Sequence, residues 1–306
     1  MYTRREFGAL SALALGGLAL PQRLAAQIDS SVGGVQIGVQ TYSFRALPRS
    51  PGGDQSEAII QAMTRCRIGD CELWSPMLEP VSGVGRDSSP DARQQARDEL
   101  RRWRVETPLT HFEAIRDRFT AAGLTIYGFN YSFTDSFSDL EIDRGFKIAR
   151  ALGAEIITAS STLSAMKRVV PFAGRHQMVV AVHNHSNISD PNEFARPESF
   201  AVATALSPYV KVNLDIGHFT AANYDPVAYL REHHASISNL HLKDRRRDQG
   251  ANVPWGTGDT PIRAVLQLLR RERWPIRAHL EYEYRGSGSP VDEVMRCFDY
   301  VKQALV

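Results

Sequence analysis

The amino-acid sequence predicts a single α/β domain in which eight parallel strands close into a (β/α)8 barrel, with an inserted loop and helix after the second strand. Eight short runs rich in apolar and β-branched residues recur along the 306 residues. Between most of these runs, apolar residues are spaced three and four positions apart, as on one face of a helix. Strands that alternate with helices indicate a parallel sheet with right-handed crossovers. Eight such units favour a closed barrel over an open sheet, and one barrel domain can reach this length.

The expected strands can be assigned in order along the chain. They cover residues 35–42, 68–74, 125–131, 155–160, 178–185, 210–216, 237–243 and 276–283. A helical pattern precedes the third strand, where Phe112, Ile115 and Phe119 would share one face. Gly123 and Gly153 stand just before the third and fourth strands, at positions where glycine commonly ends a helix. Each of these two strands is therefore expected to follow a helix that ends at a glycine.

Residues 79–108 interrupt the regular spacing between the second and third strands. Prolines and glycines flank an arginine-rich stretch, residues 91–104, that has a helical pattern. We therefore expect an inserted loop and helix at the mouth of the barrel. The sequence leaves open whether this insert covers a pocket as a lid or decorates the surface.

The first 26 residues predict a twin-arginine signal peptide. Arg4 and Arg5 precede an apolar run over residues 8–20, and Ala25 and Ala26 supply small residues near the expected cleavage point. The apolar run of 13 residues is too short to span a bilayer comfortably. We therefore expect a periplasmic or secreted protein without a membrane span in the mature chain, and a barrel domain over residues 35–303.

The expected mature chain is nearly neutral. Without residues 1–26, Lys plus Arg falls from 36 to 33 and Asp plus Glu falls from 34 to 33. Proteins that bind nucleic acids normally carry a basic bias, so we expect no nucleic-acid partner. The three cysteines form no metal-binding pair and are too few for a disulfide framework. One disulfide bond is compatible with an oxidising compartment, but the sequence does not select its partners.

Four polar residues, His183, Asp215, His241 and Glu281, fall at the ends of the last four expected strands. The carboxyl ends of barrel strands converge on one axial pocket, so these side chains are expected to meet. Two imidazoles and two carboxylates suit one divalent ion such as Mn²⁺, Zn²⁺ or Fe²⁺ better than Ca²⁺. We expect Mn²⁺ first, and Co²⁺ or Mg²⁺ would also be compatible.

Two of these assignments have alternatives in the sequence. His185 lies two residues after His183, and Glu283 lies two residues after Glu281. Side chains two positions apart on a strand point the same way. The residue pattern alone therefore does not decide which histidine and which glutamate of these pairs would bind the ion.

Several short motifs resemble those of the xylose-isomerase-like TIM barrels, and the resemblance covers about residues 35–303. That superfamily contains sugar isomerases and epimerases, inosose dehydratases and AP endonucleases of the endonuclease IV type. The similar segments are Tyr42-Ser43-Phe44, Glu72-Leu73-Trp74, Asp215 with His218, His241-Leu242-Lys243-Asp244, Gly256-Thr257-Gly258-Asp259 and Glu281.

The resemblance implies a metal site with one departure from the family pattern. In the sugar epimerases, Glu, Asp, His and Glu from strands five to eight hold one metal ion, and the two glutamates also move protons. His183, within His183-Asn184-His185, stands where many relatives have the first glutamate. The resemblance therefore makes Glu281 the expected catalytic base, beside a metal-polarised carbonyl, with His183 as a metal ligand or catalytic partner. Without the symmetric pair of carboxylate bases, elimination is favoured more strongly than the name of the family suggests.

Further residues are expected to contact the substrate. Lys243, Arg247 and His218 could stabilise an oxyanion or assist a leaving group, although a Lys-Asp-Arg-Arg-Arg segment is also typical of a solvated loop. Trp255, like Trp74, could stack on a sugar ring, although tryptophans more often belong to the core. Glu72, in the similar segment of strand two, is also expected to bind substrate.

These observations favour a metal-dependent sugar isomerase or epimerase, or a related lyase. Export indicates a small unphosphorylated carbohydrate as substrate: a free sugar, a cyclitol or a keto-glycoside. The alternative is a non-catalytic carbohydrate-binding protein on the same barrel. An endonuclease IV-type phosphodiesterase is disfavoured because strands two and three end in Glu72-Leu73-Trp74 and Gly128-Phe129-Asn130, without the extra histidine ligands. The oligomeric state stays open, and a homo-oligomer is compatible with the sequence.

Overall fold

Eight parallel strands form a closed barrel in the order β1 to β8, and β1 pairs with β8 to complete it. The structure is a computed structural model that describes residues 25–49, 53–85 and 87–306. The eight predicted strands are confirmed, each somewhat shorter than expected. They are β1 Ile37–Gln40, β2 Asp70–Trp74, β3 Thr125–Asn130, β4 Ile156–Ala159, β5 Val179–His183, β6 Val210–Asp215, β7 Ile237–Leu242 and β8 Arg277–Leu280.

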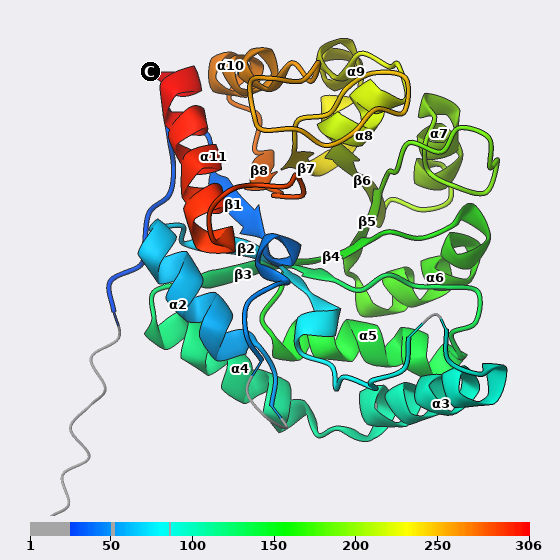
Figure 1. Ribbon diagram of the computed structural model, residues 1–306. Helices are drawn as coiled ribbons and strands as arrows, with labels where there is room; N and C mark the ends of the chain where they lie inside the picture. Colours follow the sequence, from blue (N-terminus) through cyan, green and yellow to red (C-terminus); the bar gives the residue numbers. More distant parts are fainter. Residues whose placement is uncertain (1–24, 50–52, 86) are drawn as a thin grey trace, which may run out of the picture.

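Helices surround the strands on the outside of the barrel (Figure 1). Phe112, Ile115 and Phe119 are buried as the helical pattern predicted, and Gly123 and Gly153 both have φ of +74°, the left-handed conformation that suits glycine after a helix. The α-helices are α2 Ser56–Cys66, α3 Pro90–Glu106, α4 Leu109–Ala121, α5 Asp139–Ala151, α6 Leu163–His176, α7 Pro197–Thr204, α8 Ile216–Ala221, α9 Pro226–His233, α10 Ile262–Glu272 and α11 Pro290–Leu305. The short 3-10 helices are η1 Thr41–Phe44, η2 Ser75–Met77 and η3 His234–Ser236.

Polar side chains fill much of the barrel interior toward the carboxyl ends of the strands. Barrel interiors are usually filled by bulky branched residues, whereas Gln40, Glu72, Asn213, Asn239 and His241 are buried here. Buried polar groups must satisfy one another by hydrogen bonds. The polar interior therefore fixes the side chains that lie directly beneath the barrel mouth.

The insert after β2 forms helix α3, which packs against α5 on the outside of the barrel (Figure 1). Arg104 of α3 donates to Glu79 at 2.8 Å and lies 3.7 Å from Glu141 of α5. None of the described residues in 79–108 lines the cavity at the barrel mouth. The structure therefore answers the question left open by the sequence: this insert decorates the surface of the barrel.

The predicted signal peptide lies outside the described residues except for Ala25 and Ala26. Within the described residues, no helix is both long and apolar enough to cross a bilayer. Cys66, Cys71 and Cys297 are buried free thiols, so the structure contains no disulfide bond between them.

Substitution Arg104→Ala is expected to lower the free energy of unfolding by about 3 kcal/mol, because it leaves the buried carboxylate of Glu79 without its cation. Urea unfolding of the variant beside Arg102→Ala tests this, since Arg102 is exposed on the same helix. Equal unfolding midpoints for the two variants would show that the ion pair does not hold the insert in place.

Candidate active site

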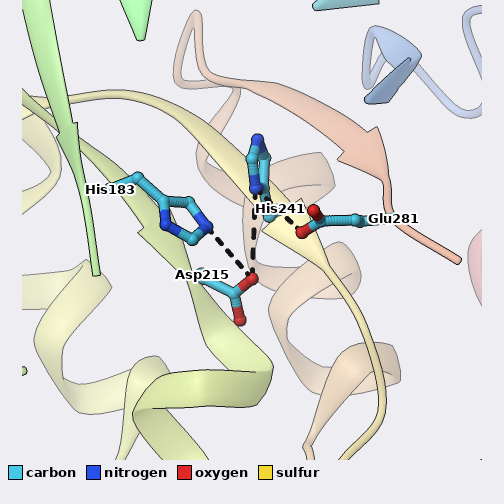
Figure 2. A group of neighbouring side chains, drawn as sticks. All are labelled: His183, Asp215, His241 and Glu281. Atoms are coloured by element: carbon cyan, nitrogen blue, oxygen red, sulfur yellow. Dashed lines mark ion pairs between the residues drawn. The ribbon is translucent and has the colours of Figure 1, made fainter. Parts of the chain in front are cut away.

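Four side chains meet at the mouth of the barrel: His183, Asp215, His241 and Glu281 (Figure 2). They come from the ends of β5, β6 and β7 and from the residue after β8, and one ligand atom of each lies within 4.8 Å of those of the others. His183 Nε2 is 3.4 Å from Asp215 Oδ2, and His241 Nδ1 is 3.0 Å from Glu281 Oε2. All four side chains are buried, with Glu281 the most accessible at 6%. The convergence expected from the sequence is present.

None of the atoms that face one another in this cluster makes a hydrogen bond of good geometry among the described residues, although the Lys243 ammonium lies 3.0 Å from Asp215 Oδ2 and 2.8 Å from Glu281 Oε2. The four facing atoms are His183 Nε2, Asp215 Oδ2, His241 Nδ1 and Glu281 Oε2. In three of these residues the atom on the other side of the group makes a hydrogen bond. His183 Nδ1 pairs with Ser160 Oγ at 3.2 Å, and His241 Nε2 pairs with Glu72 at 2.8 Å. Asp215 Oδ1 accepts a hydrogen bond from the backbone N–H of His218 at 2.6 Å. Four buried atoms that converge and are rich in lone pairs fit a divalent cation.

The structure distinguishes between the alternatives that the sequence left open. His185 lies beyond the end of β5, with its ring 5.3 Å from that of His183, and it is not part of the cluster. Glu283 instead accepts a hydrogen bond from Lys243 Nζ at 2.5 Å. The geometry therefore favours His183 and Glu281 as the residues that could hold an ion.

Glu72 lies beneath His241 and is fully buried, so the structure does not place it where a substrate could reach it. Besides the contact with His241, its carboxylate accepts hydrogen bonds from four side-chain amides, those of Gln40, Asn130, Asn213 and Asn239. Burial raises the pKa of Glu72, but the neighbouring His241 outweighs this effect and lowers the pKa to about 2. The expectation that Glu72 binds substrate is thus corrected: its ionised carboxylate orients His241.

The pairing of Glu72 with His241 fixes which imidazole nitrogen is free. An ionised carboxylate only accepts hydrogen bonds, so His241 Nε2 carries the proton that it shares with Glu72. Nδ1 then faces Asp215 and Glu281. Burial lowers the pKa of His241, but the charges of Glu72 and Glu281 raise it to about 10. The surroundings of Nδ1 therefore strongly favour a positive charge there, either a proton or a metal ion.

Lys243 places an ammonium group beside the cluster. Nζ lies 3.0 Å from Asp215, 2.8 Å from Glu281 and 2.5 Å from Glu283, and the side chain is 2% exposed. Burial lowers the pKa of Lys243, but these carboxylates raise it well above its usual value. The lysine stem passes over Gly217, where a Cβ would lie only 2.3 Å from Lys243 Cγ. Gly217, the second residue of α8, therefore leaves room for the charged side chain.

A small cavity of about 190 Å³ opens above these groups. Its walls include Tyr42 and Trp74, whose rings meet edge to face at 4.8 Å. Burial lowers the pKa of His185 to about 4 and that of His218 well below its usual value, with the charges of His183 and Lys243 acting in the same direction. The cavity is lined by Gln40, Tyr42, Trp74, Asn130, Ser160, His183, His185, His218, His241, Lys243, Glu281 and Glu283.

His218 is held as a neutral hydrogen-bonding group. Its Nδ1 accepts a hydrogen bond from Arg245 at 2.5 Å, because an arginine can only donate. The proton of the neutral ring is therefore on Nε2. His218 lines the cavity, and it offers a donor there rather than a charge.

Two residues expected to contact substrate lie elsewhere. Arg247 is exposed and Trp255 packs edge to face on Tyr300, and neither lines the cavity of the barrel mouth. The cause is Asp244, whose carboxylate accepts hydrogen bonds from the backbone N–H groups of residues 256, 258 and 260 and so shapes the loop after β7.

Three cavity residues with side chains that do not ionise were not predicted from the sequence. Gln40 and Asn130 are the last residues of β1 and β3, and Ser160 directly follows β4. Their position at strand ends is the same signal that singled out the metal-binding candidates. These three residues were not predicted because their side chains carry no ionisable group.

Comparison with known proteins agrees with this architecture. The family model described as xylose isomerase-like TIM barrel matches residues 81–301. No curated protein sequence matches the chain. Three solved structures share the fold: the D-psicose 3-epimerase of Clostridium cellulolyticum H10, the probable 3-DHS dehydratase of Bacillus anthracis and the 3-keto-D-glucoside 4-epimerase of E. coli.

The three structures are similar to this chain over nearly their whole length. The psicose epimerase has a TM-score of 0.62 at 11% identity, covering 89% of this chain and 99% of its own. The dehydratase has a TM-score of 0.60 at 15% identity, and the ketoglucoside epimerase 0.58 at 12%; each covers 88% of this chain and 99% of its own. Such identities establish a common fold, and the family model covers most of the chain. The protein therefore belongs to the xylose isomerase-like TIM barrel family.

Proposed function

We propose that this protein is a metal-dependent isomerase or epimerase, or a related lyase, that removes a proton next to a carbonyl of an unphosphorylated sugar, cyclitol or keto-glycoside. One observation carries the proposal: one ligand atom from each of two buried imidazoles and two buried carboxylates converges within 4.8 Å of the others, directly below a small polar cavity. The named epimerases and the dehydratase with the same fold support chemistry of this class.

His183, Asp215, His241 and Glu281 would hold the ion, and we expect Mn²⁺ because the set combines two imidazoles with two carboxylates. When bound, a divalent ion supplies Lewis acidity that acidifies the C–H next to a substrate carbonyl. The contact between Glu72 and His241 supports this assignment, since metal-binding histidines usually donate their second N–H to a carboxylate or a carbonyl.

Glu281 is the base in this proposal. Burial raises its pKa, but the charges of Lys243 and His241 outweigh burial and hold the pKa below its usual value, so the carboxylate is ionised and able to accept a proton. Lys243, 2.8 Å from Glu281, would stabilise negative charge on a substrate oxygen or assist a leaving group. His185 and His218, both uncharged, would contact substrate hydroxyls.

The ligand set bears on the reaction type. His183 cannot serve as a second carboxylate base, so the chain lacks the symmetric pair of glutamates that a two-base epimerisation uses. Elimination needs only one base and a group that assists departure, and Glu281 and Lys243 provide both. We therefore favour elimination within the proposed class.

The cavity supports a neutral substrate. Lys243 is the one cationic amine or guanidinium among the described residues that line it, and this ammonium is already paired with three carboxylates. No lining cation is therefore left for a phosphate group. A volume of about 190 Å³ suits a single sugar ring. The twin-arginine signal proposed from residues 1–26 agrees, because sugar phosphates are chiefly cytoplasmic.

A second candidate function, non-catalytic carbohydrate binding, is favoured by the histidine at position 183. It predicts that sugar binding persists after chelation of metal ions. The catalytic proposal predicts loss of turnover under the same treatment. Chelation followed by separate measurements of binding and turnover distinguishes the two.

Substitution Glu72→Gln is expected to weaken Mn²⁺ binding by about 10- to 100-fold, because His241 loses the carboxylate that fixes its tautomer and orientation. Titration calorimetry with Mn²⁺ measures this effect. Glu99→Gln, which alters an exposed carboxylate of α3, serves as the control. Equal Mn²⁺ affinity in the Glu72→Gln variant and wild type would show that Glu72 does not position His241 for metal binding.

Substitution Glu281→Gln is expected to lower proton exchange at the carbon next to the substrate carbonyl by about 100-fold or more, because the base is lost. Exchange with D₂O can be followed by NMR over a panel of ketohexoses and 3-keto-glucosides, with Glu198→Gln as an exposed control. Exchange that survives Glu281→Gln at the wild-type rate would assign the base to another residue.

A further inference from the structure

A second cavity, of about 470 Å³, lies beside helix α11 and shares no lining residue with the cavity of the metal site. Its walls come from the turn at Trp255, from the loop between β8 and α11, and from α11 itself. This loop and α11 are drawn in red in Figure 1. The volume falls in the range of small-molecule sites. The proposed reaction makes no use of this cavity.

Aromatic side chains form one part of the cavity wall. The rings of Trp255 and Tyr300 meet edge to face at 5.9 Å, and Tyr284 also lines the space. Gly256 has φ of +86°, and a Cβ there would lie 3.0 Å from the Tyr300 ring. The turn thus brings Trp255 close to α11. Aromatic surfaces of this kind pack well against the apolar face of a sugar ring.

The cavity wall carries an arginine that lacks an acceptor among the described residues. Arg285 is exposed at the cavity and makes no hydrogen bond or ion pair within the part of the chain that the structure describes. A ligand here must therefore supply acceptors.

The carboxylate that the cavity contains is already satisfied. Glu293 accepts hydrogen bonds from the Tyr284 hydroxyl at 2.8 Å and from the Gly288 N–H at 2.8 Å, and it pairs with Arg296. Arg285 consequently remains as an unneutralised cation at this site. Its planar guanidinium group matches a carboxylate through two parallel hydrogen bonds.

We propose that this second cavity binds a sugar ring that carries a carboxylate, such as a hexuronate residue. Arg285 pairs with the carboxylate, and the aromatic side chains cover the ring. The proposal stands independently of the reaction assigned to the metal site, because none of its residues belongs to that site.

The test compares methyl β-D-glucuronide with methyl β-D-glucoside, which differ at C6 by a carboxylate in place of a hydroxymethyl group. Titration calorimetry on the full chain is expected to show at least 10-fold tighter binding of the glucuronide. Arg285→Gln should abolish this preference, whereas Arg271→Gln, which removes an exposed cation elsewhere, should retain it. Trp255→Phe makes the aromatic surface smaller, and it should weaken glucuronide binding.

Glu281→Gln separates this cavity from the metal site. Glucuronide binding that is unchanged in Glu281→Gln and reduced in Arg285→Gln supports the proposal. Equal affinity for the two glycosides, no binding of either, or a preference that survives Arg285→Gln would overturn it. Loss of glucuronide binding in Glu281→Gln would place the ligand in the metal-site cavity instead and would also overturn it. Because Arg285 is exposed, its replacement leaves the core intact, and the test does not depend on the folding of Trp255→Phe.

Discussion

The hydrogen bond between Glu72 and His241, buried at the centre of the barrel, is the interaction on which the rest of the site depends. A carboxylate without solvent exposure costs several kcal/mol to bury unless its oxygens are satisfied. Four side-chain amides from four strands, together with His241, satisfy it. This arrangement sets the barrel interior apart from the usual apolar layers. It also turns one nitrogen of His241 toward the barrel mouth, where Asp215 and Glu281 lie.

Against the effect of burial, which raises the pKa, the Lys243 ammonium lowers the pKa of both Asp215 and Glu281 at the barrel mouth, so these two buried carboxylates remain ionised. Asp215, Glu281 and Glu283 all contact the ammonium of Lys243, and Asp215 and Glu281 also face His241. A divalent ion among the four converging atoms would add the positive charge that these carboxylates favour. In the pattern that the resemblance implies, a glutamate stands where this chain has His183, so a negative ligand would be replaced by a neutral one. Imidazole is also a good ligand for divalent metal ions, and the change shifts the proposed reaction toward a single carboxylate base.

The sequence predicted the fold and the converging residues because both rest on periodic signals. Eight apolar runs fixed the strands, and the rule that strand ends converge brought His183, Asp215, His241 and Glu281 together. The errors arose where position depends on loop geometry or on depth in the barrel. Trp255 and Arg247 lie away from the cavity at the barrel mouth because the hydrogen bonds of Asp244 shape their loop. Glu72 is buried beneath His241, too deep in the barrel for a substrate to reach it. The depth of a side chain in the barrel and the path of a long loop depend on long-range contacts, which the spacing of residues in the sequence does not encode.

Metal content tests the central claim most directly. Elemental analysis by mass spectrometry of the purified protein, beside His241→Ala and Glu281→Ala, should find about one Mn, Zn, Fe or Co ion per wild-type chain and a loss of that ion in both variants. Absence of metal from the wild type, even after incubation with each ion, would contradict the account. The barrel would then be better explained as a carbohydrate-binding protein whose polar core no longer serves catalysis.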